Sequence, residues 1–191
     1  MTIRGYSLVE TLVALGILMI AVAAAAPAIH AYSVDAQLIG AARQFEGCFR
    51  RAHSIAVKRS AYTAIRFERG PDGVSYSLYS DGNRNGVSSA DIAAGVDLRL
   101  EGPYRLTSGA RDVRVAIDPG TPAIPPDSGM LDGTDPIRFG KSDTLSFSPL
   151  GTATPGTFYL AGVGAQAAVR VSPGSARVRL FVRRSGRWSE R

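Results

Sequence analysis

The chain has very little of the residue types that build disulfides, metal centres and catalytic relays. Its 191 residues include one cysteine and two histidines. The single Cys48 excludes an intrachain disulfide, and we expect it to act as a small buried apolar side chain. His30 and His53 lie far apart on one helical segment, which favours packing roles over metal ligation. With no nucleophile motif or Cys-x-x-Cys pair present, the sequence predicts a protein that is not an enzyme and needs no cofactor.

Charge is missing from one long stretch near the N-terminus. The run from Leu12 to Ile29 has 18 residues without a charge, and as a helix it spans roughly 27 Å, close to the thickness of the hydrocarbon core of a bilayer. One explanation is a secretory signal peptide that is cut within residues 23–28, and another is a plain membrane anchor. Neither needs a carboxylate at the start of the run, where Glu10 stands, because an unpaired acid at the bilayer edge costs free energy.

The segment RGYSLVE, residues 4–10, resembles the prepilin peptidase site of type IV pilins and type II secretion pseudopilins. The resemblance implies a leader of residues 1–5, cleavage after Gly5 and N-methylation of Tyr6. It puts Glu10 at the fifth mature position, where the N-terminal ammonium of a neighbouring subunit would pair with it and fix the filament register. Pro27 matches a proline that commonly kinks the pilin helix.

Hydrophobic residues continue beyond this run at helical spacing. Their steps of three and four residues predict an amphipathic helix. We expect one unbroken helix from about Ser7 to Lys58, with residues 6–29 in the membrane or filament core and residues 30–60 leading into a head domain. The stripe consists of Val34, Leu38, Ala42, Phe45, Phe49 and Ala52.

After Ser60 the hydrophobic period changes to two, which predicts a β-rich head over residues 61–191. A first hairpin is expected from the alternation at 63–67 and 74–78 around a Gly- and Pro-containing turn. The fold class is therefore α+β: a long N-terminal helix, membrane-spanning in its first half, packed on a small antiparallel β-sheet head, as in pilins. Residues 118–143 should form a long irregular loop, and further strands are expected at 98–100, 112–117, 144–148, 157–161, 167–172 and 176–184.

The last of these segments carry a second resemblance. Residues 147–151, 156–160, 168–171 and 177–179 resemble the C-terminal half of the GspH/FimT group, the minor pseudopilins of type II secretion and minor pilins of type IV pili. The resemblance implies a structural subunit that initiates, caps or decorates a filament. Its partners would be prepilin peptidase and other pilin or pseudopilin subunits. It would cross the bacterial inner membrane once, with the head in the periplasm.

A loop rich in Asp, Asn and Gly follows the first hairpin. Asp81, Asn83, Asn85 and Asp91 have nearly the spacing of the oxygen ligands in an EF-hand calcium loop. The closing acid comes one position early, and Arg84 lies inside the loop. These residues also favour tight turns without any metal. Calcium is thus a possible ligand, and we expect weak or no binding.

The net charge of +6 is concentrated at the C-terminus. Residues 165–191 hold seven arginines and one glutamate, so the rest of the chain is neutral. Strand alternation places Val178, Leu180 and Val182 towards the core, and Arg177, Arg179, Phe181 and Arg183 outward. A strand face rich in arginine suits a nucleic-acid phosphate backbone. FimT-type minor pilins that bind DNA carry a Gly-Arg-x-Arg motif at this place, and residues 177–179 resemble the Arg-x-Arg part of that motif. Capture of DNA for uptake is therefore the alternative function, and a solvated edge face is the plain explanation. A periplasmic β-domain exported by a signal peptide is the third.

Overall fold

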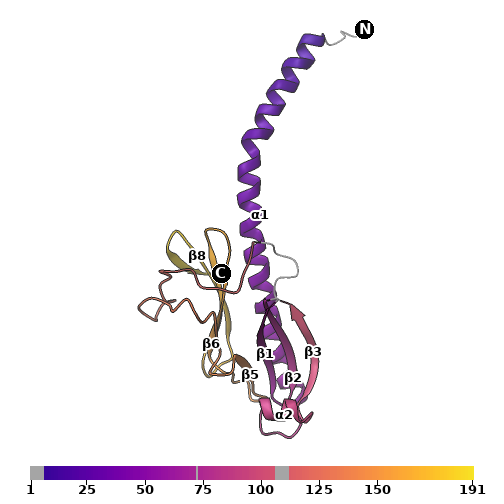
Figure 1. Ribbon diagram of the computed structural model, residues 1–191, viewed down its shortest axis with the longest axis vertical. Helices are drawn as coiled ribbons and strands as arrows, with labels where there is room; N and C mark the ends of the chain where they lie inside the picture. Colours follow the sequence, from indigo (N-terminus) through magenta and orange to yellow (C-terminus); the bar gives the residue numbers. More distant parts are fainter. Residues whose placement is uncertain (1–6, 72, 106–111) are drawn as a thin grey trace.

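A single long helix leads into a head of two β-sheets (Figure 1). The computed structural model describes residues 7–71, 73–105 and 112–191, and only the backbone of residues 26–31. The helix, α1, runs from Leu8 to Arg59 without interruption, as expected from the sequence. The Ser7 side chain caps its start, and Ser60 ends it in the left-handed conformation with φ 52°. Figure 1 shows the N-terminal half of α1 projecting away from the head.

The first sheet contains the predicted hairpin. Its strand order is β3-β2-β1-β5, and all neighbours are antiparallel. The sequence prediction for residues 98–100 falls within a longer β3, and a short helix α2 that was not predicted precedes it. The elements are β1 Thr63–Gly70, β2 Gly73–Ser80, α2 Ser89–Ala93, β3 Leu98–Arg105 and β5 Thr144–Phe147.

The second sheet is built from the C-terminal third of the chain. Its order is β4-β6-β7-β8-β9, again antiparallel. Strands β6, β7 and β8 lie where the sequence predicted them, whereas β4 and β9 were missed because each has too few residues to show alternation. The elements are β4 Ile137–Arg138, β6 Gly156–Ala161, β7 Gln166–Val171, β8 Val178–Arg184 and β9 Arg187–Glu190.

The C-terminal half of α1 forms the centre of the main core. The predicted stripe from Val34 to Ala52 is buried, and residues of both sheets pack against it. Phe45 and Phe49 meet Phe158 of β6 at ring-centroid distances of 4.6 and 6.4 Å. Phe49 also meets Phe139 at 5.7 Å in an edge-on arrangement, a geometry that adds to the stabilisation from burial. The helix and the head therefore share one core.

A second, smaller core lies on the face of the second sheet opposite α1. Tyr159, Phe181 and Ala168 of that face are covered by Ile117 and Ile124. The expected strand at 112–117 is wrong: a single bridge joins Arg114 to Ala161 there, with N–H···O distances of 2.9 and 2.8 Å. The chain leaves the sheet after this bridge to cover the second core, and the expected loop at 118–143 is otherwise irregular apart from β4 and a bridge between Pro122 and Met130.

Candidate functional site

The N-terminal half of α1 is apolar and bare. Its residues Leu8–Ala25 have a mean hydropathy of 2.4, and none of them is buried within the described structure. By length and composition this segment is able to cross a membrane. A helix that is hydrophobic all round needs lipid or other helices to cover it. The chain alone thus leaves this surface unpartnered, while the other half of the same helix is covered by the head.

Glu10 lies in the first turn of α1, at the start of this bare surface. Its backbone N–H donates to the Ser7 Oγ at 3.4 Å, and its side chain has no ion pair among the residues that the structure describes. A carboxylate in the first turn is favoured by the helix dipole. Gly5 and Tyr6 lie outside the described residues, and α1 continues through Pro27 as an unbroken helix. Cleavage, methylation, Glu10 pairing and the Pro27 kink stay predictions.

The loop after β2 is organised around two carboxylates that accept backbone hydrogen bonds. Asp81 is buried, with oxygens accepting from the N–H groups of Asn83, Arg84 and Gly86 at 3.0, 2.7 and 2.8 Å. Asp97 is also buried and accepts from the N–H groups of Gly82 and Ser88 at 3.1 and 2.9 Å. Asp97, which the sequence analysis missed, therefore links the start and the end of the loop through backbone N–H groups.

Two of the remaining predicted calcium ligands, Asn83 and Asp91, also accept hydrogen bonds within the loop. Asp91 accepts from the Ser88 Oγ at 2.8 Å and from the Asn85 amide at 3.2 Å. These contacts, led by the one with Ser88, lower the pKa of Asp91. Within residues 7–71, 73–105 and 112–191, no three His, Cys, Asp or Glu side chains form a group that could hold a metal ion. The geometry is that of a self-supporting Asx-rich loop.

The predicted arginine face is divided among three environments. Arg177 precedes β8 and is exposed. Arg179 is partly buried, donates to the Ser172 Oγ at 3.0 Å, and lies 3.7 Å from Glu190. Arg183 is partly buried at the other end of β8, about 20 Å along the strand from Arg177.

Phe181, expected to face outward, is instead buried in the second core at 7% exposure. It does lie on the face opposite Leu180, as the alternation requires, but the segment through Ile117 and Ile124 covers that face. The guanidinium of Arg179 stacks over its ring at 5.7 Å. The three arginines therefore do not form a continuous free ladder.

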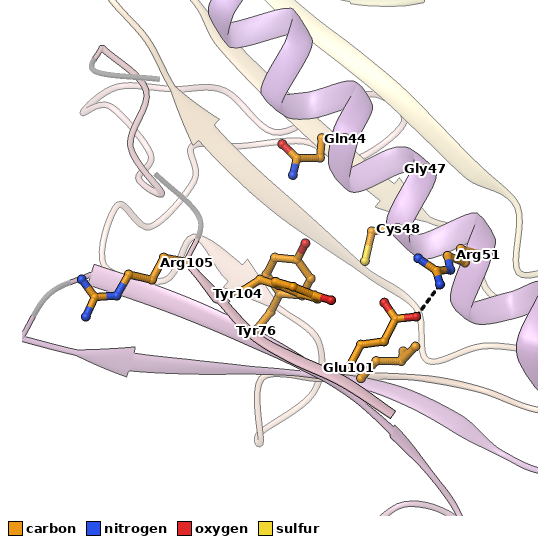
Figure 2. A pocket seen from close by; sticks show the side chains of 9 residues that line it. Gln44, Gly47, Cys48, Arg51, Tyr76, Glu101, Tyr104 and Arg105 are labelled. Carbon is orange, nitrogen blue, oxygen red and sulfur yellow. Dashed lines mark ion pairs between the residues drawn. The ribbon is translucent and has the colours of Figure 1, made fainter. Parts of the chain in front are cut away.

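A groove lies between α1 and the β2–β3 pair (Figure 2). Its volume is about 440 Å³, and its lining includes Cys48, Tyr76 and Tyr104. An ion pair of 2.5 Å between Arg51 and Glu101 bridges the helix and β3. Burial, followed by the nearby Glu101 charge, raises the pKa of Cys48 to about 11. The thiol is thus protonated and has little nucleophilic character.

Figure 1 and the site geometry together define a class of protein: a β-head built on one half of a long helix whose other half is left bare for lipid or neighbouring subunits. This is the α+β pilin-like architecture. A family model described as "Type II transport protein GspH" matches residues 41–175, which is more than two thirds of the chain. The chain belongs to this family, whose members are structural pseudopilins and not enzymes. No curated protein and no solved structure gives a match.

The family match covers α1 only from residue 41 to its end, together with the first sheet and β4 to β7. It therefore supports the pseudopilin architecture and assembly with other pseudopilin subunits. One N-terminal apolar helix together with this match is consistent with single-pass anchoring in the inner membrane. The prepilin-like segment and the strands β8 and β9 lie outside the matched residues.

Proposed function

We propose that this chain is a minor pseudopilin or minor pilin, a structural subunit of a type II secretion pseudopilus or a type IV pilus. The observation that carries the proposal is the contrast between the two halves of α1. None of Leu8–Ala25 is buried, whereas Leu38, Phe45 and Phe49 are almost fully buried in the head. One rigid helix thereby presents an assembly surface and holds a folded domain at a fixed distance from it.

In this proposal the chain enters the inner membrane through residues 6–29, with the head in the periplasm. Prepilin peptidase removes residues 1–5, and Tyr6 becomes the methylated N-terminus. Glu10 then accepts the ammonium group of a neighbouring subunit as α1 enters the filament core, because a carboxylate in an apolar core needs a cation. The head decorates, initiates or caps the filament.

Two measurements test the proposal. Mass spectrometry of the mature N-terminus should find methylated Tyr6, and a terminus within residues 23–28 would instead establish the signal peptide. Glu10→Ala should reduce incorporation into filaments while membrane insertion and head stability stay unchanged. Glu46→Ala is the matched control, since Glu46 on the same helix is paired with Arg50 at 2.6 Å. Equal incorporation of both variants would refute the role of Glu10.

DNA capture is the second candidate, and one observation favours it. The excess of positive charge lies in the C-terminal segment, where Arg177 and Arg183 have no ion pair among the described residues. Because Arg179 is held by Ser172 and Glu190, fewer phosphates would be neutralised than a continuous ladder allows. Binding would then be independent of sequence and lost at high salt.

A further inference from the structure

The turn between β8 and β9 lies at the end of the second sheet that faces the bare half of α1. Arg184, the last residue of β8, forms an ion pair with Asp35 of α1. The neighbouring β6–β7 turn lies at the same end, because Gly162 adjoins the Leu38 side chain. Figure 1 shows this end of the β8 region beside the middle of α1, where the helix leaves the head.

This end of the head lies close to where a bilayer surface would be. Asp35 is ten residues beyond Ala25, the last residue of the apolar span, and thus about 15 Å further along the helix axis. Measured from Ile29, where the uncharged run ends, the distance is about 9 Å. The headgroup layer occupies roughly 5–8 Å of this distance. The remaining gap is within about one Debye length, so charges there still feel the membrane surface.

The charges at this end are basic and incompletely paired. We call Arg183, Arg184 and Arg187 the arginine rim. Arg184 is bound to Asp35, but Arg183 and Arg187 have no ion pair within the described parts of the chain. The Nε of Arg183 is buried without a hydrogen-bond partner there. In register, Arg184 lies opposite Arg187, so like charges adjoin across the two strands, which is unfavourable, and Asp35 offsets only one of them through its ion pair with Arg184.

Two exposed side chains near the rim suit an interface between water and lipid. Tyr32 is 78% exposed and lies one helical turn before Asp35, while Val163 is 70% exposed in the β6–β7 turn. Tyrosine is enriched at the headgroup level of membranes, since its ring is apolar and its hydroxyl polar. Neither side chain contributes to the core of the head, so neither is needed there for folding.

We propose that the arginine rim docks the head onto anionic phospholipid headgroups, and that a lipid surface is the partner of this end of the molecule. The inference rests on the membrane insertion of α1 stated above but not on filament formation. Docking fixes the tilt of the head relative to the bilayer while the subunit waits in the membrane. The rim lies outside residues 41–175, which match the family model.

The single tryptophan of the chain provides the readout. Trp188 lies opposite Arg183 in the β8–β9 pair, and its Nε1 donates to the Pro122 carbonyl at 2.9 Å. The full chain is placed in nanodiscs of phosphatidylcholine, with or without phosphatidylglycerol, that contain a dansyl-labelled headgroup. Energy transfer from Trp188 to dansyl should be higher in the anionic discs, and high salt should remove the difference.

The test variant is R183Q/R187Q, and its matched control is R59Q/R99Q, which removes two exposed arginines from the opposite end of the head. The docking equilibrium should weaken about 25-fold in the test variant, taking about fivefold for each basic residue at an anionic surface. The control should keep the lipid-dependent transfer. Circular dichroism of both variants tests whether they are folded.

The other outcomes overturn the inference in distinguishable ways. A chain that is absent from purified nanodiscs refutes membrane insertion and, with it, both the proposed function and the docking. A chain that inserts but shows equal transfer in both lipids, or equal loss in test and control variants, refutes the docking alone. If R183Q/R187Q no longer binds labelled duplex DNA while its energy transfer to the dansyl lipid equals that of the unmodified chain, the arginine rim binds nucleic acid instead of lipid.

Discussion

Replacing Phe49 by alanine should separate the stability of the head from the rest of α1. Phe49 is fully buried, and its ring meets those of Phe45, Phe67, Phe139 and Phe158 at centroid distances of 5.7 to 6.4 Å. Truncating a buried phenylalanine costs about 3–5 kcal/mol, because transfer free energy is lost and a cavity remains. Apart from Phe45 on the same helix, these rings come from β1, β6 and the residue after β4, so little collapse into that cavity is expected.

The cost translates into a thermal shift. For a domain of this size, about 1 kcal/mol corresponds to roughly 2–4 °C, so F49A should lower the unfolding temperature by roughly 6–20 °C. Near-UV circular dichroism of the full chain in detergent follows the packing of the aromatic rings. The helical signal should persist through part of this transition. Detergent covers the N-terminal half of α1, so the helical structure of that half does not depend on the head.

Two variants make the result interpretable. Val57→Ala removes an apolar side chain that is 47% exposed on the same helix, and it should change stability by less than about 0.5 kcal/mol. Phe49→Leu keeps most of the volume and should recover most of the loss. If F49A and V57A shift the transition equally, α1 does not share a core with the head, and the reasoning on the two halves of the helix fails.

Three further predictions concern the loop, the groove and acid stability. Calorimetry with Ca²⁺ on the full chain should show weak or no binding, since backbone N–H groups already occupy the Asp81 oxygens; chelator-sensitive melting that disappears in Asp81→Ala would show a calcium site. Iodoacetamide at pH 8 should alkylate Cys48 about 100-fold more slowly in the folded chain than in the denatured chain. The reason is that folding raises the pKa of Cys48 from 9.0 to about 11, which lowers the fraction of reactive thiolate. Equal rates would contradict the burial of Cys48. The pKa values of Asp91 and Asp132 are lowered by hydrogen bonds, from Ser88 and from the Thr134 backbone respectively. The stability that these carboxylates give to the fold is therefore present above the unfolded pKa of 3.8 and is lost as the pH falls through the folded pKa values. Urea unfolding on acidification should show this loss of stability, and Asp91→Asn should show less of it.

The sequence was sufficient for features that depend on neighbours within a few positions. The length of α1, its apolar run and its stripe from Val34 to Ala52 follow from a periodicity repeated over many turns. The β1–β2 hairpin follows from alternation around a Gly-containing turn. The prepilin-like segment and the GspH-like order of strands were both inferred from short sequence motifs. The family match agrees with the GspH-like order of strands.

Features that depend on contacts between distant segments required the tertiary structure. Alternation shows that Phe181 and Leu180 lie on opposite faces of β8, but not that the segment through Ile117 and Ile124 covers the Phe181 face. In the same way, the spacing of Asp and Asn residues suggested a calcium loop closed by Asp91. In the structure the chain folds back so that Asp97 accepts hydrogen bonds from the N–H groups of Gly82 and Ser88.

The sequence by itself determined the long helix, the alternating strands and the surplus of arginine at the C-terminus, because these are properties of local period and composition. Only the tertiary structure decided which arginines have hydrogen-bond or ion-pair partners and which do not. The register of β7, β8 and β9 puts Arg179 within reach of Ser172 and Glu190, and it puts Arg184 beside Asp35 near the middle of α1. Strand pairing sets these positions through hydrogen bonds between segments far apart in the chain, and no local pattern encodes such pairing.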